Sequence, residues 1–193
     1  MEWHKLQSSR LAVIAELVSR APAGYLGRTA VMKFCYLLQT VRGVPLGYHF
    51  TLYSYGPFDT GVLSDLGTAE ALEAVKSNVK LYQGGYGYQI RKGERSAAVI
   101  EAGRSFLNNH LGSIDWVLSE FGSHGSSDLE LESTIVFVDR ESAGKSRQLT
   151  IPALAQWVRD IKPHFEETYI AEKAMELFSR QMLDSARPAL AHA

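Results

Sequence analysis

Apolar residues recur at helical spacing through most of the first forty positions. Over residues 9–20 they return every three to four positions, and the Ala-Pro-Ala-Gly stretch at 21–24 ends this predicted helix. A second helix is predicted from about residue 27 to Gly43, which stops it. Because the apolar stripe of the second helix is broad, we expect that helix to be central.

The pattern changes to alternation in two later stretches. Residues 48–55, YHFTLYSY, alternate and are rich in aromatic and β-branched types, so they predict a short strand. Helical stretches are predicted over 60–66 and 68–75. The clearest local signal is VKLYQGGYGYQI, which predicts a β-hairpin over residues 79–91 with Gly84-Gly85 as its two-residue loop.

The second half of the chain is mainly helical in pattern. Two helices are predicted over 94–110 and 113–121, followed after a loop at 140–148 by two more over 150–161 and 166–185. Residues 129–139 are ambiguous. Their β-branched run favours a strand, whereas a Ser127–Glu130 capping box and the apolar spacing favour a helix, and we choose the helix.

These elements predict a mostly α fold with a small antiparallel β-sheet, that is, an α+β fold. Helix, helix, strand, helix, hairpin, helix is a winged-helix-like order, and the strand at 48–55 is expected to join the hairpin in one sheet. We expect a single domain over 1–193. It would comprise a motif-bearing lobe over 1–97, a helical lobe over 98–186 and a frayed tail over 187–193.

Composition narrows the class of protein. The 193 residues are 46% hydrophobic and 21% charged, which is typical of a globular domain and excludes a disordered tail or a coiled coil. The single cysteine, Cys35, excludes an internal disulfide and is expected to be a buried thiol. No stretch approaches the roughly 18 apolar residues of a membrane span. Since no signal peptide is evident either, we expect a cytoplasmic protein.

The formal net charge of −1 hides an asymmetry. Residues 1–97 carry 11 Lys and Arg against 7 Asp and Glu, a net of +4, and residues 98–193 carry 9 against 14, a net of −5. The near-neutral total gives no general attraction to nucleic acid, but the split predicts two differently charged lobes.

The chain shows no recognisable catalytic, cofactor or metal motif. Its six histidines have no ligand spacing, and Gly122-Ser123-His124-Gly125 is one residue short of a nucleophile elbow. Gly84-Gly85-Tyr86-Gly87 lies between two strands, so it lacks the helix N-terminus that a phosphate site uses. Asp128, Glu130 and Glu132 are interpreted as a solvated helix start. We therefore expect no enzyme, no cofactor and no metal.

Aromatic and basic residues gather in the first half of the chain. Tyrosines and a phenylalanine flank Gly56-Pro57, and Arg28 and Lys33 are expected on the polar side of the second helix. The hairpin adds further tyrosines and bases: Lys76, Lys80, Tyr82, Tyr86, Tyr88, Arg91, Lys92 and Arg95. The two interpretations are half-buried strand aromatics with bases alongside them, or a platform that binds a protein or DNA phosphates.

Residues 27–66 carry a more specific pattern. They read GRTAVMKFCYLLQTVRGVPLGYHFTLYSYGPFDTGVLSDL, with a basic and Thr helix start, a Lys–apolar–apolar–Tyr–Leu core, a Gly-x-Pro-Leu turn and a Tyr-Gly-Pro-Phe segment before a helix that ends in Asp-Leu. This block resembles the SocA-like antitoxin, or Panacea, domain and its YwgA-like relatives. A similar block occurs in the toxin-neutralising part of antitoxins that counter DNA ADP-ribosylating toxins. The residues that carry the resemblance are Arg28, Thr29, Lys33, Tyr36, Leu37, Gly43, Pro45, Leu46, Tyr53, Tyr55, Gly56, Pro57, Phe58, Asp65 and Leu66.

The resemblance implies a bacterial, non-enzymatic protein-interaction module that neutralises a toxin or acts as a protease adaptor. The partner-binding residues would be Arg28, Lys33, Tyr53, Tyr55, Gly56, Pro57 and Phe58. The alternative hypothesis is a winged-helix DNA-binding regulator that contacts DNA through Lys80, Arg91, Lys92 and Arg95. Both hypotheses exclude a membrane partner and leave a homo-oligomer open.

Overall fold

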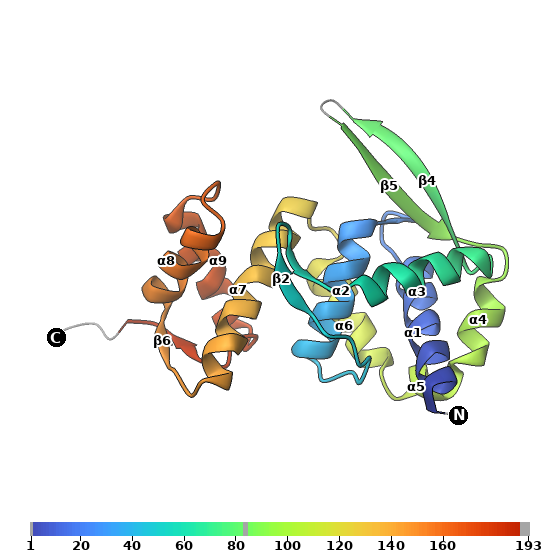
Figure 1. Cartoon of the computed structure of the whole chain (residues 1–193), viewed down its shortest axis with the longest axis horizontal. Coiled ribbons are helices and arrows are strands. Elements are labelled where there is room, and N and C mark those ends of the chain that lie inside the picture. The colour runs from blue at the N-terminus through green and yellow to red at the C-terminus, as the bar shows by residue number, and fades with distance from the viewer. Residues whose placement is uncertain (1, 83–84, 190–193) are drawn as a thin grey trace. The chain divides into compact units, whose positions relative to one another are not determined.

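The structure is a computed structural model that describes residues 2–82 and 85–189 (Figure 1). The chain forms two compact units. The first comprises Met1–Thr51 and Phe58–Leu129, and the second comprises Leu52–Pro57 and Glu130–Ala193. The single domain that we expect stays a prediction, and the two units are described in turn.

The first unit is built on helices that pack around α1. Its helices are α1 (Glu2–Ser19), α2 (Arg28–Thr40), α3 (Thr60–Ala71), α4 (Ser96–Ala102), α5 (Arg104–Asn108) and α6 (Leu111–Phe121). The middle of α1 is fully buried, and α1 packs against α3 and α4 while α2 packs against α6. All residues of α2 from Val31 to Leu38 are buried, so the broad stripe does mark a central helix.

One predicted helix is interrupted. The expected helix over 94–110 breaks into α4 and α5 at Gly103. A Cβ on Gly103 would lie 2.2 Å from the Cβ of Ala12, so glycine permits the close approach of this segment to α1. Conversely, the two expected stretches at 60–66 and 68–75 merge into one helix, α3, which ends at Ala71, so the prediction was wrong at Val75, where β4 begins. The Asp59 side chain caps α3 by accepting a hydrogen bond from the Gly61 N–H.

A three-stranded antiparallel sheet completes the first unit. Its order is β1 (Leu26–Gly27), β5 (Gly85–Lys92), β4 (Val75–Tyr82), with Leu26 opposite Ile90 and Val79 opposite Tyr88. The hairpin is confirmed. Its Gly84-Gly85 loop is wrong at Gly85, which pairs with Tyr82 inside the ladder, whereas Gly84 lies outside the described residues.

The strand expected at 48–55 does not join this sheet, and β1 takes its place. Both backbone groups of Tyr48 are bound by the Gln39 side chain, at 2.9 Å each, and the His49 N–H donates to the Asp59 carboxylate. Because these groups are occupied, only the end of the segment becomes a strand. That strand, β2 (Thr51–Tyr53), pairs with β3 (Gly56–Phe58) in a separate two-stranded ribbon.

The second unit contains three helices and a parallel strand pair. The helices are α7 (Ser126–Gly144), of which residues 130 onward belong to this unit, α8 (Ile151–Ile161) and α9 (Glu167–Ser179). β6 (Leu149–Thr150) pairs in parallel with β7 (Ala186–Arg187). The Thr150 side chain accepts a hydrogen bond from the Ala153 N–H and so caps α8, which packs against α9.

The structure decides the open choice at 129–139 in favour of the helix. Three boundaries of the second unit were wrong: α7 continues to Gly144 into the expected loop, α9 ends at Ser179, and Ala186–Arg187 forms a strand where a frayed tail was expected to begin. Residues 190–193 of that tail lie outside the described residues. In the first unit, α1 begins at Glu2 and not at residue 9.

The fold is therefore mostly α with small β-sheets, an α+β fold as predicted. The winged-helix-like order of helices and hairpin is present in the first unit, where α1, β1, α2 and α3 precede the β4–β5 hairpin. Within the described part of the chain, no helix combines the length and the apolar character that crossing a bilayer requires.

Candidate interaction surfaces

A buried polar cluster lies beneath residues 46–48, within the 27–66 block. The Tyr48 hydroxyl donates to the Asp65 carboxylate at 2.9 Å, and Arg10 Nη1 lies 3.7 Å from the same carboxylate. Arg10 also donates to the carbonyls of Leu46 and Gly47, each at 2.5 Å, and its guanidinium stacks over the Tyr48 ring. These contacts join α1, α3 and the 46–48 segment of that block.

Burial controls the protonation of this cluster. It raises the pKa of Asp65 and that of Tyr48, and it raises the pKa of the Cys35 thiol to about 12, with the Asp65 charge adding to the effect. A thiol with such a pKa stays protonated at neutral pH and is a poor nucleophile. The burial of this cluster and its internal contacts indicate that its residues stabilise the fold.

The β2–β3 ribbon presents two tyrosines from a fixed base. Lys162, which is buried, donates to the Ser54 carbonyl and forms an ion pair with Glu130 Oε1 at 2.8 Å. Gly56 has a φ of +84°, and a Cβ there would lie 3.0 Å from Thr134 Oγ1. The second unit therefore contains both the ribbon tip and the helix residues that hold it.

The predicted partner-binding residues of this block separate by exposure. Tyr53 and Tyr55 are 66% and 71% exposed, whereas Gly56 and Pro57 are buried and Phe58 is half-buried. Of these residues, only the two tyrosines expose most of their side chains.

The two bases of α2 do not form an exposed polar side. Lys33 is only 2% exposed, so the expectation that it lies on the polar side of its helix was wrong. The physical reason is that α2 is buried on every side over Val31–Leu38. Arg28, at the start of α2, stacks its guanidinium over the Tyr88 ring at 3.6 Å, which places it against the middle of β5.

The β4–β5 hairpin, residues 75–92, extends away from the helices of the first unit and is called the wing below (Figure 1). Because side chains alternate along a strand, the register places Val79, Leu81, Tyr86 and Tyr88 on one face. Val79, Leu81 and Tyr86 are 62%, 80% and 67% exposed, and the rings of Tyr86 and Tyr88 meet edge to face. The wing therefore carries an exposed apolar face. The Tyr82 side chain lies outside the described part of the structure.

The predicted DNA contacts do not share one face of the wing. Lys80 and Arg91 occupy positions on the face opposite the apolar one, together with Lys76. Lys92 pairs with Val75 and so belongs to the other face, and Arg95 follows the end of β5. All four are exposed, but Arg91 also bonds to Gln89 and lies over the Tyr25 ring.

The structure also shows buried charges that the sequence did not indicate. Glu130 and Glu132 are buried, so their interpretation as part of a solvated helix start was wrong. Glu130 pairs with Lys162, and Glu132 Oε1 lies 3.9 Å from Lys173 Nζ. Since both bases are far along the chain, only the three-dimensional fold could reveal these pairs.

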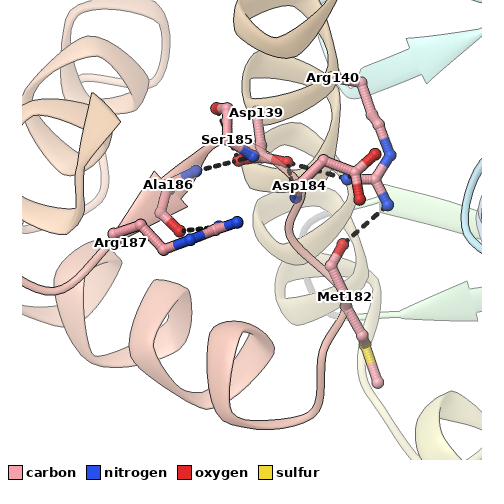
Figure 2. A network of polar contacts seen from close by, with 7 residues as sticks. All are labelled: Asp139, Arg140, Met182, Asp184, Ser185, Ala186 and Arg187. Atoms are coloured by element: carbon pink, nitrogen blue, oxygen red, sulfur yellow. Dashed lines mark hydrogen bonds and ion pairs between the residues drawn. The ribbon is translucent and has the colours of Figure 1, made fainter. Parts of the chain in front are cut away.

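Asp139 is the most heavily bonded of these charges (Figure 2). Its fully buried carboxylate accepts hydrogen bonds from the backbone N–H groups of Asp184, Ser185 and Ala186 and from the Ser185 hydroxyl, at 2.6–2.9 Å. Arg140 Nη1 lies 2.9 Å from the same carboxylate. An aspartate directly after the apolar run IVFV was the available signal, because a buried carboxylate needs several partners.

In the described ranges, no three or more His, Cys, Asp and Glu side chains gather as a metal-binding group. The chain matches no protein-family model, and no curated protein is significantly similar to it. On the basis of side-chain exposure, two candidate interaction surfaces are described: the apolar face of the wing, and Tyr53 with Tyr55 of the β2–β3 ribbon.

Proposed function

We propose that this chain is a protein-interaction module, not an enzyme, and that the apolar face of the wing is its main contact surface. The observation that carries the proposal is the exposure of Val79, Leu81 and Tyr86 on one face of a hairpin that extends from the first unit. Exposed apolar side chains that are contiguous, unlike scattered ones, are typical of surfaces that bind other proteins. Tyrosine is also enriched in such interfaces.

The resemblance of residues 27–66 to SocA-like antitoxins supports a specific kind of partner. On that basis the chain would neutralise a toxin, or deliver a substrate to a protease, in the cytoplasm. Tyr53 and Tyr55 would add a second contact, since they are exposed and held in place by the Lys162–Ser54 hydrogen bond.

Affinity purification and a growth assay in the native host test this proposal together. Removal of the chain should make the product of a neighbouring gene toxic, and that product should co-purify with the tagged wild-type chain. The variant Val79→Thr with Leu81→Thr should lose both the protection and the co-purified protein, because threonine keeps the strand preference but removes the apolar surface.

Leu72→Gln is the matched control, because Leu72 is an exposed leucine of the same unit outside the wing. It should behave like the wild type. The proposal is wrong if the threonine variant protects cells and retains the partner as well as the wild type does.

A winged-helix DNA-binding regulator is the second candidate function. Two observations favour it. The β4–β5 hairpin follows α1, α2 and α3 along the chain and forms a sheet with β1, and the hairpin exposes the bases Lys80, Arg91 and Lys92. It predicts binding to duplex DNA that weakens steeply with salt and is lost when these three bases are replaced by glutamine. Absence of binding at about 50 mM salt would remove this candidate.

A further inference from the structure

The outer edge of β4 offers backbone groups as well as apolar side chains. β4 is the last strand in the order β1-β5-β4, so one of its edges faces away from the sheet. The Ser77 N–H donates to the Glu70 carboxylate at 3.2 Å, which shows that this N–H points away from β5. In an antiparallel ladder the N–H and C=O groups of every second residue point to the same side. The backbone groups of Val79 and Leu81 therefore also point outward.

Side chains at this open edge have a definite pattern. Val79 and Leu81 lie on the apolar face, and Lys80 between them lies on the opposite face together with Lys76. A strand that pairs with Val79 and Leu81 places its own side chains beside them in the same alternation. Apolar residues would fit opposite Val79 and Leu81, and an acidic residue would fit opposite Lys80.

We infer that the β4 edge at Val79–Leu81 binds an extended segment of the partner protein that alternates apolar, acidic and apolar residues, by addition of a strand to the sheet. This inference rests on the proposed interaction function and specifies the chemistry of its partner. Main-chain hydrogen bonds give the contact its direction. The alternation of Val79, Lys80 and Leu81 gives it a sequence preference.

A second copy of the chain fits this edge less well. In the antiparallel register that pairs Val79 of one copy with Leu81 of the other, the two Lys80 side chains stand directly opposite each other. Like charges at such a position destabilise a strand pair. A register shifted toward the start of β4 meets the Ser77 N–H, which Glu70 already occupies.

The probe is a short capped peptide of alternating valine and glutamate, measured against the full chain by fluorescence anisotropy and amide hydrogen exchange. Binding should slow the exchange of the Val79 and Leu81 amides, whereas the Asn78 and Lys80 amides, which point toward β5, should change little. The same peptide with N-methylated valines should not bind, because it lacks the donors that a ladder needs.

Charge exchange tests the side-chain preference. The variant Lys76→Glu with Lys80→Glu should lose the valine–glutamate peptide and gain a valine–lysine peptide. Lys145→Glu, an exposed lysine of the second unit, is the matched control and should leave both affinities unchanged.

The outcomes separate this inference from the proposed function. Slowed exchange at Tyr86 and Tyr88 in place of Val79 and Leu81 would overturn it, as would concentration-dependent protection of Val79 and Leu81 without peptide, which would indicate a second copy. If the threonine variant loses the native partner but no alternating peptide binds, strand addition is wrong and the interaction module stands. If the threonine variant keeps its partner, the proposed function itself fails.

Discussion

The carboxylate of Asp139 holds the segment after α9 against α7, and replacing it by asparagine has a predictable effect on stability. One oxygen accepts from the Ser185 N–H, the Ser185 hydroxyl and the Ala186 N–H, and the other accepts from the Asp184 N–H and faces Arg140 (Figure 2). Asparagine has nearly the same shape, but it carries only one oxygen and no charge. Asp139→Asn therefore keeps the volume of the side chain and removes about half of its acceptors.

The magnitude follows from these contacts. If the remaining oxygen of the asparagine stays with Ser185 and Ala186, its NH₂ group faces the Asp184 N–H and Arg140, and two charge-assisted contacts are lost. Each such contact contributes about 1.5–3 kcal/mol when its acceptor is charged. Because Arg140 is partly exposed, we take the lower end, which gives a loss of about 3 kcal/mol in the free energy of unfolding.

Urea unfolding of the full chain measures this loss, followed by the fluorescence of its three tryptophans, of which Trp157 lies on α8 in the second unit. Amide exchange gives a local readout. The amides of Asp184, Ser185 and Ala186 should exchange about a hundredfold faster in the variant, since 1.4 kcal/mol corresponds to about a factor of ten.

Asp184→Asn is the matched control. The Asp184 side chain is largely exposed, and its ion pair with Arg140 at 3.1 Å should contribute less than about 1 kcal/mol. The reasoning is refuted if Asp139→Asn changes the free energy of unfolding by no more than the control does. Unchanged exchange of the Ser185 and Ala186 amides would refute it equally.

Three further predictions concern buried groups of the two units. Because burial raises the pKa of Asp65, the folded chain binds a proton there more readily than the unfolded chain, and the stability that this group contributes falls as pH rises from about 4 through the folded pKa. Asp65→Asn should remove this fall in urea titrations at several pH values. An unchanged pH dependence would contradict this prediction. The Cys35 thiol, with its pKa raised to about 12, should resist a thiol reagent at pH of about 8 in the native chain and react fully in denaturant; native reactivity would show that it is accessible. Lys162→Met should lower the free energy of unfolding by about 3–5 kcal/mol, because it leaves the buried Glu130 without the Lys162 cation. The control Arg159→Met, at a more exposed base of α8, should lower it by less than about 1 kcal/mol. Adding Glu130→Gln to Lys162→Met should recover part of the larger loss, and simple additivity in urea unfolding would disprove the coupling.

The helices and the hairpin whose formation depends on residues close by in the sequence were predictable. Helical spacing located α1, α2, α6 and α8, and the glycine between two alternating runs located the wing. The choice of a helix over a strand at 129–139 was right, in agreement with the apolar spacing. The capping box at Ser127 was not, because α7 begins at Ser126 and Ser127 therefore lies inside the helix.

Elements whose partners lie far along the chain were not predictable in this way. β1 has two residues and exists as a strand because Leu26 and Gly27 pair with Ile90 and Gln89. The segment at 48–55 has the alternation of a strand, but the Gln39 side chain binds the backbone of Tyr48. A periodic pattern reports which side chains are apolar, not which backbone groups are already bonded.

The candidate site shows the same division. The exposed tyrosines Tyr53 and Tyr55 were among the predicted contact residues. Val79 and Leu81 of the wing were not, although the alternation of the strand places them on one face. Lys33, Glu130 and Glu132 were expected at the surface because they are charged, yet they are buried. Glu130 is 32 positions from Lys162 in the sequence, so nothing local indicates that its charge is paired.

The winged-helix-like order allows the two candidate functions to be compared at α3, the helix before the hairpin. A helix that binds DNA needs cations or polar side chains that face the duplex. α3 contains no Lys or Arg, and its Asp65 is bonded inward to Tyr48. The bases that the DNA hypothesis invokes, Lys80, Arg91, Lys92 and Arg95, lie instead on the wing and after it. Those on the wing are divided between its two faces, whereas Val79, Leu81 and Tyr86 share one face. Phosphate contacts release counterions, so each one steepens the loss of affinity with salt, while apolar burial and strand pairing do not. A salt titration of partner binding and of DNA binding, on the same wing variants, therefore separates the two functions. An interaction module loses much less affinity in salt than a DNA regulator does, because only the contact at Lys80 is screened, and it loses its partner when Val79 and Leu81 are replaced. A DNA regulator loses its DNA steeply with salt and keeps it when Val79 and Leu81 are replaced.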